Sequence, residues 1–140
     1  MQQIFVDTFY WVALIHPADQ WSEAVLTLAK SAPVDWQYVT TDEVLAEVLT
    51  FYGGSGRYLR QKTTELIRSI LQDPTVRVIA QTHGSFVAGL ELYEQRLDKG
   101  YSLIGCISMQ TMKQNQISAV LTRDRHFAQE GFVLLLNQDA

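Results

Sequence analysis

Three acidic residues that lie far apart in the sequence are placed where they could act together. Asp7 ends the apolar run Ile4–Val6, and Asp124 follows a second apolar run that ends at Leu121. Short apolar runs of this kind are typical of buried strands. Parallel strands bring their carboxyl ends to a common edge, where open α/β sheets place ligands. We therefore expect these two carboxylates to lie close together, which raises a pKa or requires a shared metal.

Glu47 is the third candidate and lies within an apolar stretch. It follows Glu43 by one helical turn, and Leu45, Ala46, Val48 and Leu49 flank it. Like charges at this spacing repel by a few tenths of a kcal/mol, and a carboxylate drawn into an apolar face needs a partner. Two simpler interpretations remain open. Asp7 could cap the helix that follows it, and Glu47 could be solvated at the edge of its helix.

Strands and helices alternate along the chain. Strands are expected at residues 3–7, 36–39, 76–80, 117–121 and 133–136. Helical segments are expected at residues 9–14, 18–31, 42–52, 57–71, 82–98 and 102–114. This alternation predicts an α/β fold with a mostly parallel central sheet of 4–5 strands and helices on both faces. We expect a single domain over residues 1–140, since the length suits one core and no boundary is visible.

Local signals refine the helices. Thr40 and Glu43 fit a capping box, and Ser102 fits the N-cap of the helix 102–114. The glycine-rich stretch 53–56 lacks the spacing of a phosphate loop and is interpreted as a connector. Gly100 is expected to end the helix 82–98. Helical spacing also predicts the inward residues of two helices, which are Val44, Leu45, Val48, Leu49 and Tyr52 in one, and Phe86, Leu90, Tyr93 and Leu97 in the other.

Composition limits the possible partners and compartments. The formal net charge is −4, so any binding of nucleic acid must come from a local basic patch or a bound metal. No apolar run approaches the ~18 residues that a membrane span needs. A single cysteine, Cys106, fits a reducing compartment, and the first residues lack the basic region of a signal peptide. We therefore expect a cytoplasmic protein.

Several motifs resemble the PIN domain, and within it the VapC-type toxins of toxin–antitoxin modules. The matching segments are residues 5–8, 41–49 and 121–127, the last followed by Gly131-Phe132, and residues 101–106 match in part. The most specific piece is Thr122-x-Asp124-x-His126-Phe127. The resemblance covers nearly the whole chain and implies a PIN-like three-layer fold.

The resemblance also implies an activity and partners. In that family, four acidic residues gather one or two Mg²⁺ or Mn²⁺ ions and cleave RNA. By position, three of these acids map onto Asp7, Glu47 and Asp124, which would be the metal-binding and catalytic residues. Members of the family form homodimers and bind a cognate antitoxin whose tail covers the acidic cleft.

The third acidic position departs from the family pattern. Gly105 stands there, and Ile104 replaces the threonine that usually precedes the acid. An acid at the third residue of a helix would suit the helix dipole, whereas glycine costs about 1 kcal/mol of helix propensity. Three explanations stay open, which are close backbone approach to a neighbouring element, natural loss of a ligand, or an engineered change. We hypothesise that this protein binds metal weakly and cleaves slowly.

Supporting roles fall to residues near the acids and on one basic helix. Thr122 could bond a metal ligand or backbone. His126 could be a ligand or general base, although a hydrogen bond that fixes the Asp124 loop is the simpler role. RNA phosphates could be held by Arg123 and Arg125 beside Asp124, or by Arg57 and Arg60, which share their helix with Lys62 and Arg68. A solvated charged face is the simpler interpretation for that helix.

The sequence therefore predicts a metal-dependent endoribonuclease toxin, attenuated because Gly105 replaces an acid. The alternative is a non-catalytic PIN-like module that binds RNA or a protein. A phosphotransferase with a strand-terminal Asp is disfavoured, since Phe9 stands where a second Asp would be needed.

Overall fold

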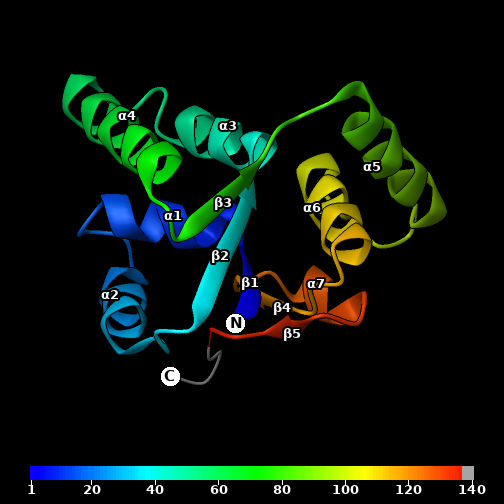
Figure 1. The fold of residues 1–140 in the computed structure, drawn as a ribbon. Coiled ribbons are helices and arrows are strands. Elements are labelled where there is room, and N and C mark those ends of the chain that lie inside the picture. The colour runs from blue at the N-terminus through cyan, green and yellow to red at the C-terminus, as the bar shows by residue number, and fades with distance from the viewer. Residues whose placement is uncertain (137–140) are drawn as a thin grey trace.

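The computed structural model describes residues 1–136, and within them five strands form one parallel sheet. The strand order is β3-β2-β1-β4-β5 (Figure 1). The strands are β1 (Gln2–Val6), β2 (Trp36–Thr41), β3 (Val76–Ile79), β4 (Ala119–Leu121) and β5 (Val133–Leu134). The α/β prediction with a parallel sheet is thus confirmed.

Helices connect the strands on both faces of the sheet. They are α1 (Thr8–Ile15), α2 (Ser22–Ser31), α3 (Asp42–Phe51), α4 (Arg57–Gln72), α5 (His83–Gln95), α6 (Leu103–Gln114) and α7 (Arg125–Gln129). The chain runs outward from β1 to β3 and then crosses back to β4 and β5. Right-handed crossovers therefore place α1–α4 on one face and α5–α7 on the other, as Figure 1 shows for α4 and for the α5–α6 pair.

The central strand β1 is the most buried part of the sheet. Ile4, Phe5 and Val6 are fully buried, and β1 pairs with β2 on one side and with β4 on the other. Val6 pairs with Leu121, so the carboxyl ends of β1 and β4 lie side by side. This register brings the residues after each strand, Asp7 and Thr122, to one edge. No helix among residues 1–136 is long and apolar enough to cross a membrane.

Two differences from the predicted elements concern short segments. The sequence pattern did not predict α7, a helix of five residues that begins directly after Asp124. Helix α5 ends at Gln95 rather than at Gly100, which adopts a positive φ of 70° in the turn that follows. A five-residue helix shows too little apolar periodicity to be seen in sequence.

The inward face predicted for α5 is wrong. Phe86, Leu90 and Tyr93 are between 44% and 46% exposed and Leu97 is 79% exposed, whereas Leu92 is buried. Gly89 is buried as well, and a Cβ at this position would lie 2.3 Å from Ile107 Cγ1 and 3.2 Å from the Ile107 Cα. The α5–α6 contact thus depends on a glycine, which carries no apolar signal, so the periodicity pointed to the wrong face. Leu49 of α3, predicted to lie inward, is also exposed.

The capping box predicted at Thr40 and Glu43 is also wrong. The N-cap of α3 is Thr41, whose hydroxyl accepts a hydrogen bond from the Val44 amide at 3.1 Å. Thr40 instead donates its hydroxyl to the Val6 carbonyl at 3.0 Å, and Glu43 accepts one from the Ser85 hydroxyl at 2.6 Å. Either of two adjacent threonines could cap this helix, and the position of β2 in the sheet decides which one does. The prediction of Ser102 as an N-cap is confirmed by its bond from the Gly105 amide.

Candidate active site

Asp7 lies at the end of the central strand and is 8% exposed. Although it occupies the N-cap position of α1, its side chain makes no capping hydrogen bond there. The Thr122 hydroxyl donates to Asp7 Oδ2 at 2.8 Å. Burial raises the pKa of Asp7 to about 6, and the hydrogen bonds from Thr122 and the Thr8 amide oppose this rise. The alternative that Asp7 merely caps a helix is therefore not supported.

Glu47 reaches toward the same edge from α3. Its carboxylate accepts a short hydrogen bond from the hydroxyl of Thr8, the residue directly after Asp7. Glu47 is half-buried, so the interpretation that it is simply solvated at the helix edge does not describe it. Its charge raises the pKa of Asp7. Thr8 was not singled out in sequence, although its place directly after the strand-terminal acid is a signal that could have found it.

Asp124 is held by its own loop. Its Oδ1 accepts a hydrogen bond from the His126 amide at 2.9 Å and lies 3.2 Å from His126 Nδ1. The Asp124 amide donates to the Thr122 hydroxyl at 3.1 Å. Thr122 thus accepts from one acidic residue and donates to another, and it fixes Asp124 relative to Asp7. The supporting roles of Thr122 and His126 stay predictions, and the His126 ring faces the Asp124 carboxylate rather than a backbone group.

The electrostatics of this edge are unfavourable for an isolated carboxylate. The charged side chains of Glu47 and Asp124 both raise the pKa of Asp7. The strongest ion pairs of the described residues gather instead on Glu130, which pairs with Arg96 and Lys113. The ionised form of Asp7 is therefore costly until a cation approaches.

The donor chemistry of this site fits a hard cation, but few acids converge on it. Carboxylate and hydroxyl oxygens are the ligands that Mg²⁺ and Mn²⁺ prefer. Within residues 1–136, however, no three His, Cys, Asp or Glu side chains lie close enough to form a ready metal centre. The Thr122 hydroxyl joins the Asp7 carboxylate to the Asp124 amide, and the hydroxyl of Thr8, the residue after Asp7, bonds Glu47. Their joint binding of one ion stays a prediction.

Gly105 is buried in the first turn of α6, at the position of the expected third acid. A Cβ there would meet one atom within 4 Å, the Ser102 hydroxyl at 3.0 Å. No atom of a neighbouring element lies within 4 Å of that Cβ, so close packing does not explain this glycine. Natural loss of a ligand and an engineered change both stay predictions. The Ser102 hydroxyl ends a side chain that can rotate, so space for a carboxylate exists.

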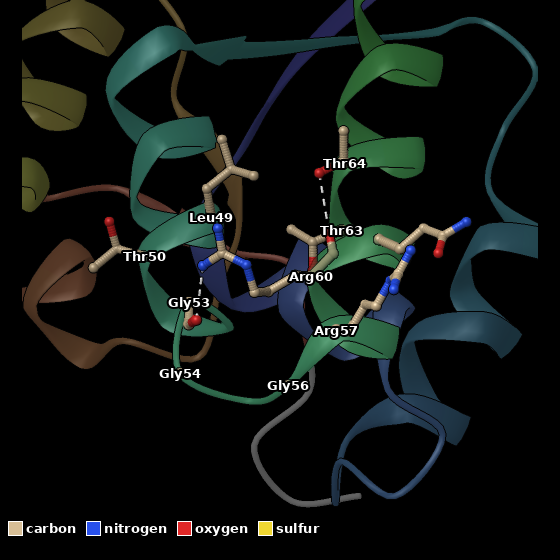
Figure 2. Close-up of a pocket in the computed structure, with 10 residues that line it drawn as sticks. Leu49, Thr50, Gly53, Gly54, Gly56, Arg57, Arg60, Thr63 and Thr64 are labelled. Carbon is tan, nitrogen blue, oxygen red and sulfur yellow. Dashed lines mark hydrogen bonds between the residues drawn. The ribbon is translucent and has the colours of Figure 1, made fainter.

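The basic helix α4 borders a pocket of its own. Arg57 and Arg60 line an open pocket of about 1020 Å³ between the end of α3 and the first turns of α4. Figure 2 shows Arg60 extending to the glycine turn, where its Nη1 donates to the Gly53 carbonyl at 2.8 Å. Arg60 therefore has a structural role, whereas Arg57 stands exposed at the start of the helix.

The two arginines beside Asp124 differ in their surroundings. Arg123 lies over the indole of Trp21, with its Cζ 3.3 Å from the ring centroid. Arg125 is exposed at the first residue of α7. Trp21 is partly exposed. Nothing in the local sequence joins residue 21 to residue 123, so this contact could not have been predicted.

Comparison with known proteins identifies relatives of this arrangement. The PIN domain matches residues 4–132. The crystal structure of Mycobacterium tuberculosis VapC20, described as a sarcin-ricin loop cleaving toxin, is similar, with a TM-score of 0.84 and 25% identity. That match covers 96% of this chain and 99% of VapC20. FitAcB from Neisseria gonorrhoeae shares the fold, with a TM-score of 0.63 and 19% identity over 94% of this chain and 96% of that one. A comparison with curated proteins gave no match.

Proposed function

Because the chain belongs to the PIN-domain family, we propose that it is a VapC-type ribonuclease toxin that uses Mg²⁺ or Mn²⁺ and cleaves slowly. The observation that carries this proposal is Asp7. A buried carboxylate with a pKa raised to about 6, beside two further carboxylates, is characteristic of a site that receives a cation. A bound divalent cation would lower the pKa of a water and offset charge on an RNA phosphate.

The residues of this chain would hold and orient that ion. Asp7 and Asp124 would be its ligands, and Glu47 would contribute from α3. Thr122 fixes the first two relative to each other, since its hydroxyl bonds the Asp7 carboxylate and the Asp124 amide. Thr8 holds the Glu47 carboxylate in the same way. His126 orients Asp124 by two contacts to one carboxylate oxygen, and it has a positioning role rather than a catalytic one.

The attenuation follows from Gly105. Phosphodiester cleavage at a metal site depends on charge that the ligands place around the ion. The first turn of α6 lacks an acidic residue, so one corner of the site supplies no carboxylate. Two ligands and water can still hold one ion loosely. We therefore expect weak metal binding and slow cleavage.

Replacing Gly105 by Asp tests the proposal. We expect Gly105→Asp to raise the rate of Mn²⁺-dependent cleavage of a single-stranded RNA at least about tenfold, equivalent to about 1.4 kcal/mol in the barrier. Gly105→Asn is the matched control, because it adds the same volume without the charge. EDTA should abolish the gain, and the double variant Asp7→Asn/Gly105→Asp should lack it. Equal rates for the Asp and Asn variants would contradict the proposal.

The alternative function is a non-catalytic module that binds RNA or protein. The absence of three converging acids in the described residues favours it. It predicts RNA binding that EDTA does not change and no cleavage by the Gly105→Asp variant. The same experiment thus separates the two functions.

We also infer two protein partners, an antitoxin and a second copy of this chain. VapC20, a solved structure of the same fold, is described as a toxin. The exposed apolar residues Phe86, Leu90 and Tyr93 of α5, together with Leu97 just after it, form a surface that a second copy could cover. Sedimentation of the parent protein and of Leu90→Lys measures the oligomeric state. If α5 holds a dimer, the parent should sediment as a dimer and Leu90→Lys as a monomer.

A further inference from the structure

We propose that Tyr101 positions the Asp124 carboxylate for the metal ion, acting through the His126 ring, and that Glu130 anchors Tyr101 in turn. This inference rests on the metal-dependent function proposed above, in which Asp124 is a ligand. It adds the residues that fix the direction of that ligand. Tyr101 is 5% exposed and lies in the connection between α5 and α6. It would not touch the ion, so it is a positioning residue.

The Asp124 carboxylate needs a second group to fix its direction, because its side chain is 41% exposed. Within residues 1–136, the contacts to this carboxylate both reach Oδ1, from the His126 amide at 2.9 Å and from His126 Nδ1 at 3.2 Å. The amide fixes one point of the carboxylate, and the ring nitrogen restricts its rotation. Carboxylates that bind metals are commonly oriented by such contacts. A carboxylate held by one oxygen presents the other oxygen to an ion.

The His126 ring is held in place by Tyr101. The His126 side chain is 34% exposed, so solvent by itself would not fix the ring. The Tyr101 ring packs against it with centroids 5.0 Å apart and planes tilted by 47°, which is a usual geometry for aromatic pairs. Rotation of the imidazole away from Asp124 would give up this packing. Tyr101 therefore favours the orientation in which Nδ1 faces the carboxylate.

Tyr101 contacts both ends of the short helix α7. Its hydroxyl donates to Glu130 Oε1 at 3.2 Å, and its ring meets His126, four residues earlier. Residues four apart lie on the same face of a helix, so one side chain bridges a turn of α7. A helix of five residues is too short to be stable alone, and its direction depends on tertiary contacts. Phe127 is also buried, but it lies about 100° around the helix from His126 and does not hold that ring.

Glu130 is itself fixed from two further helices. Arg96 donates to both of its carboxylate oxygens, from Nε at 2.7 Å and from Nη2 at 3.2 Å, and Lys113 Nζ donates to Oε2 at 2.9 Å. Arg96 is the C-cap of α5, and Lys113 lies in the last turn of α6. Bidentate pairs of arginine and carboxylate are geometrically specific. The Tyr101 hydroxyl is therefore attached to a fixed point.

Nitrogen NMR of the histidines in the metal-free protein tests the contact between Tyr101 and His126. In alkaline solution, where imidazoles are neutral, His126 Nδ1 should carry the proton in the parent, because it faces a carboxylate oxygen. Tyr101→Leu should release the ring, so that the proton is shared between both nitrogens. The chain has three histidines, and His126→Ala identifies the signal. Tyr52→Leu is the matched control and should leave the signal unchanged, since Tyr52 is also buried and donates its hydroxyl elsewhere.

Mn²⁺ binding without RNA tests the effect on Asp124, and the electron paramagnetic resonance signal of the unbound ion measures it. We expect Tyr101→Leu to weaken Mn²⁺ binding about tenfold, the lower end of the range for residues that orient a metal ligand. In the His126→Ala background, the same substitution should have no further effect, because Tyr101 acts through that ring. A residue that only stabilises the fold would lower affinity equally in both backgrounds. The Gly105→Asp variant allows the same comparison at higher affinity.

Two results would overturn the inference. One is a His126 signal that Tyr101→Leu does not change, and the other is additive losses of Mn²⁺ affinity for Tyr101→Leu and His126→Ala. Thermal unfolding shows whether each variant is folded. If Tyr101→Leu does not fold, Tyr101→Phe replaces it, since it removes only the hydroxyl bond to Glu130. It should weaken Mn²⁺ binding about threefold, as expected for a hydrogen bond at the weak end of the usual range, and equal affinity to the parent would overturn the inference.

Failure of the proposed function would appear differently. Neither the parent nor the Gly105→Asp variant would then bind Mn²⁺, although the His126 signal would still respond to Tyr101→Leu. The orientation of His126 by Tyr101 would stand in that case, and the metal-binding step would fall together with the proposed function.

Discussion

At the scale of single residues, the surroundings of Asp7 disfavour its ionised form. Its carboxyl is buried, and the charges of Glu47 and Asp124 add to the desolvation that raises its pKa to about 6. Because the ordinary pKa is 3.8, the native state binds this proton more tightly than the unfolded chain does. Stability should therefore fall as the pH rises from about 4 to about 6. The metal-binding role that we propose for Asp7 would explain why such a residue is tolerated.

Neutralising Asp7 should stabilise the protein at neutral pH. A shift of about two pKa units corresponds to roughly 3 kcal/mol, and we expect Asp7→Asn to raise the free energy of unfolding by about 1–3 kcal/mol at pH 7.5. The amide oxygen can still accept the hydrogen bond from Thr122. Urea unfolding in EDTA measures the difference, which should shrink toward pH 4. Asp35→Asn, at an exposed position, is the control. A variant less stable than the parent at both pH values would contradict this account.

At the scale of elements, the α5–α6 pair depends on the absence of one side chain. Gly89 lets the backbone of Ile107 approach, so α5 contacts α6 through Gly89 rather than through Phe86, Leu90 and Tyr93. The apolar stripe of α5 is left exposed as a result. The position of α6 bears on the proposed function, because its first turn carries Gly105.

Gly89→Ala should destabilise the protein although alanine favours helices. Its Cβ would lie 2.3 Å from Ile107 Cγ1 and 3.2 Å from backbone atoms, so the two helices must separate. Overpacking of this kind costs typically 1–3 kcal/mol. Gly84→Ala in the same helix is the matched control, since its Cβ would meet ordinary contacts at 3.5 Å. It should be neutral or stabilising by about 0.5–1 kcal/mol. Urea unfolding of both variants should show opposite signs, and equal signs would refute the packing argument.

Glu130 links α5, α6 and the turn before β5. Its side chain is 6% exposed and accepts hydrogen bonds from Arg96, Lys113 and Tyr101. The hydrogen bond from Arg96 is the largest of the effects that lower the pKa of Glu130 to about 2. The native state thus favours the ionised form. The stability that this gives is present above about pH 4.5 and is lost as the pH falls through about 2.

Glu130→Gln should therefore destabilise the protein at neutral pH. Hydrogen bonds to charged groups contribute about 1.5–3 kcal/mol, and the partial exposure of Arg96 and Lys113 places our expectation at the lower end. The deficit should diminish as the pH falls from about 4.5 toward 2. Lys113→Met, which removes one partner, should cost less. Thermal unfolding at several pH values measures this, and a deficit that does not change with pH would contradict the electrostatic explanation.

At the scale of the whole molecule, the net charge of −4 opposes RNA binding. The RNA binding that we propose would therefore depend on local features, which are the acidic edge with a bound cation and the exposed Arg57 of α4. The proposed sites are far apart in sequence, so the fold has to gather them. Loss of one phosphate contact lowers the slope of log K against log salt concentration by about 0.7 for single strands.

Arg57→Gln should weaken RNA binding and reduce this salt slope by about 0.7. Arg77→Gln changes the net charge equally but lies on the edge strand β3, and it should have little effect if binding is local. Titrations at several salt concentrations measure both slopes. Equal effects of the two substitutions would mean that the overall field, rather than a site at α4, governs binding.

The sequence by itself determined the order of strands and helices, the parallel sheet and the family. Apolar runs and helical periodicity are local, and the acids that follow strands 3–7 and 117–121 had to reach one edge once the strands were parallel. The departure at Gly105 was equally visible, because a helix N-terminus after Ser102 favours an acid.

Only the tertiary structure decided how these residues are held. Periodicity gave α5 the wrong inward face, since the contact with Ile107 is made through Gly89, which has no side chain to detect. The hydroxyl links from Thr8 to Glu47 and from Thr122 to Asp7 join segments 39 and 115 residues apart. The same holds for Trp21 and Arg123. Such contacts depend on the packing of distant elements, and no local pattern encodes them.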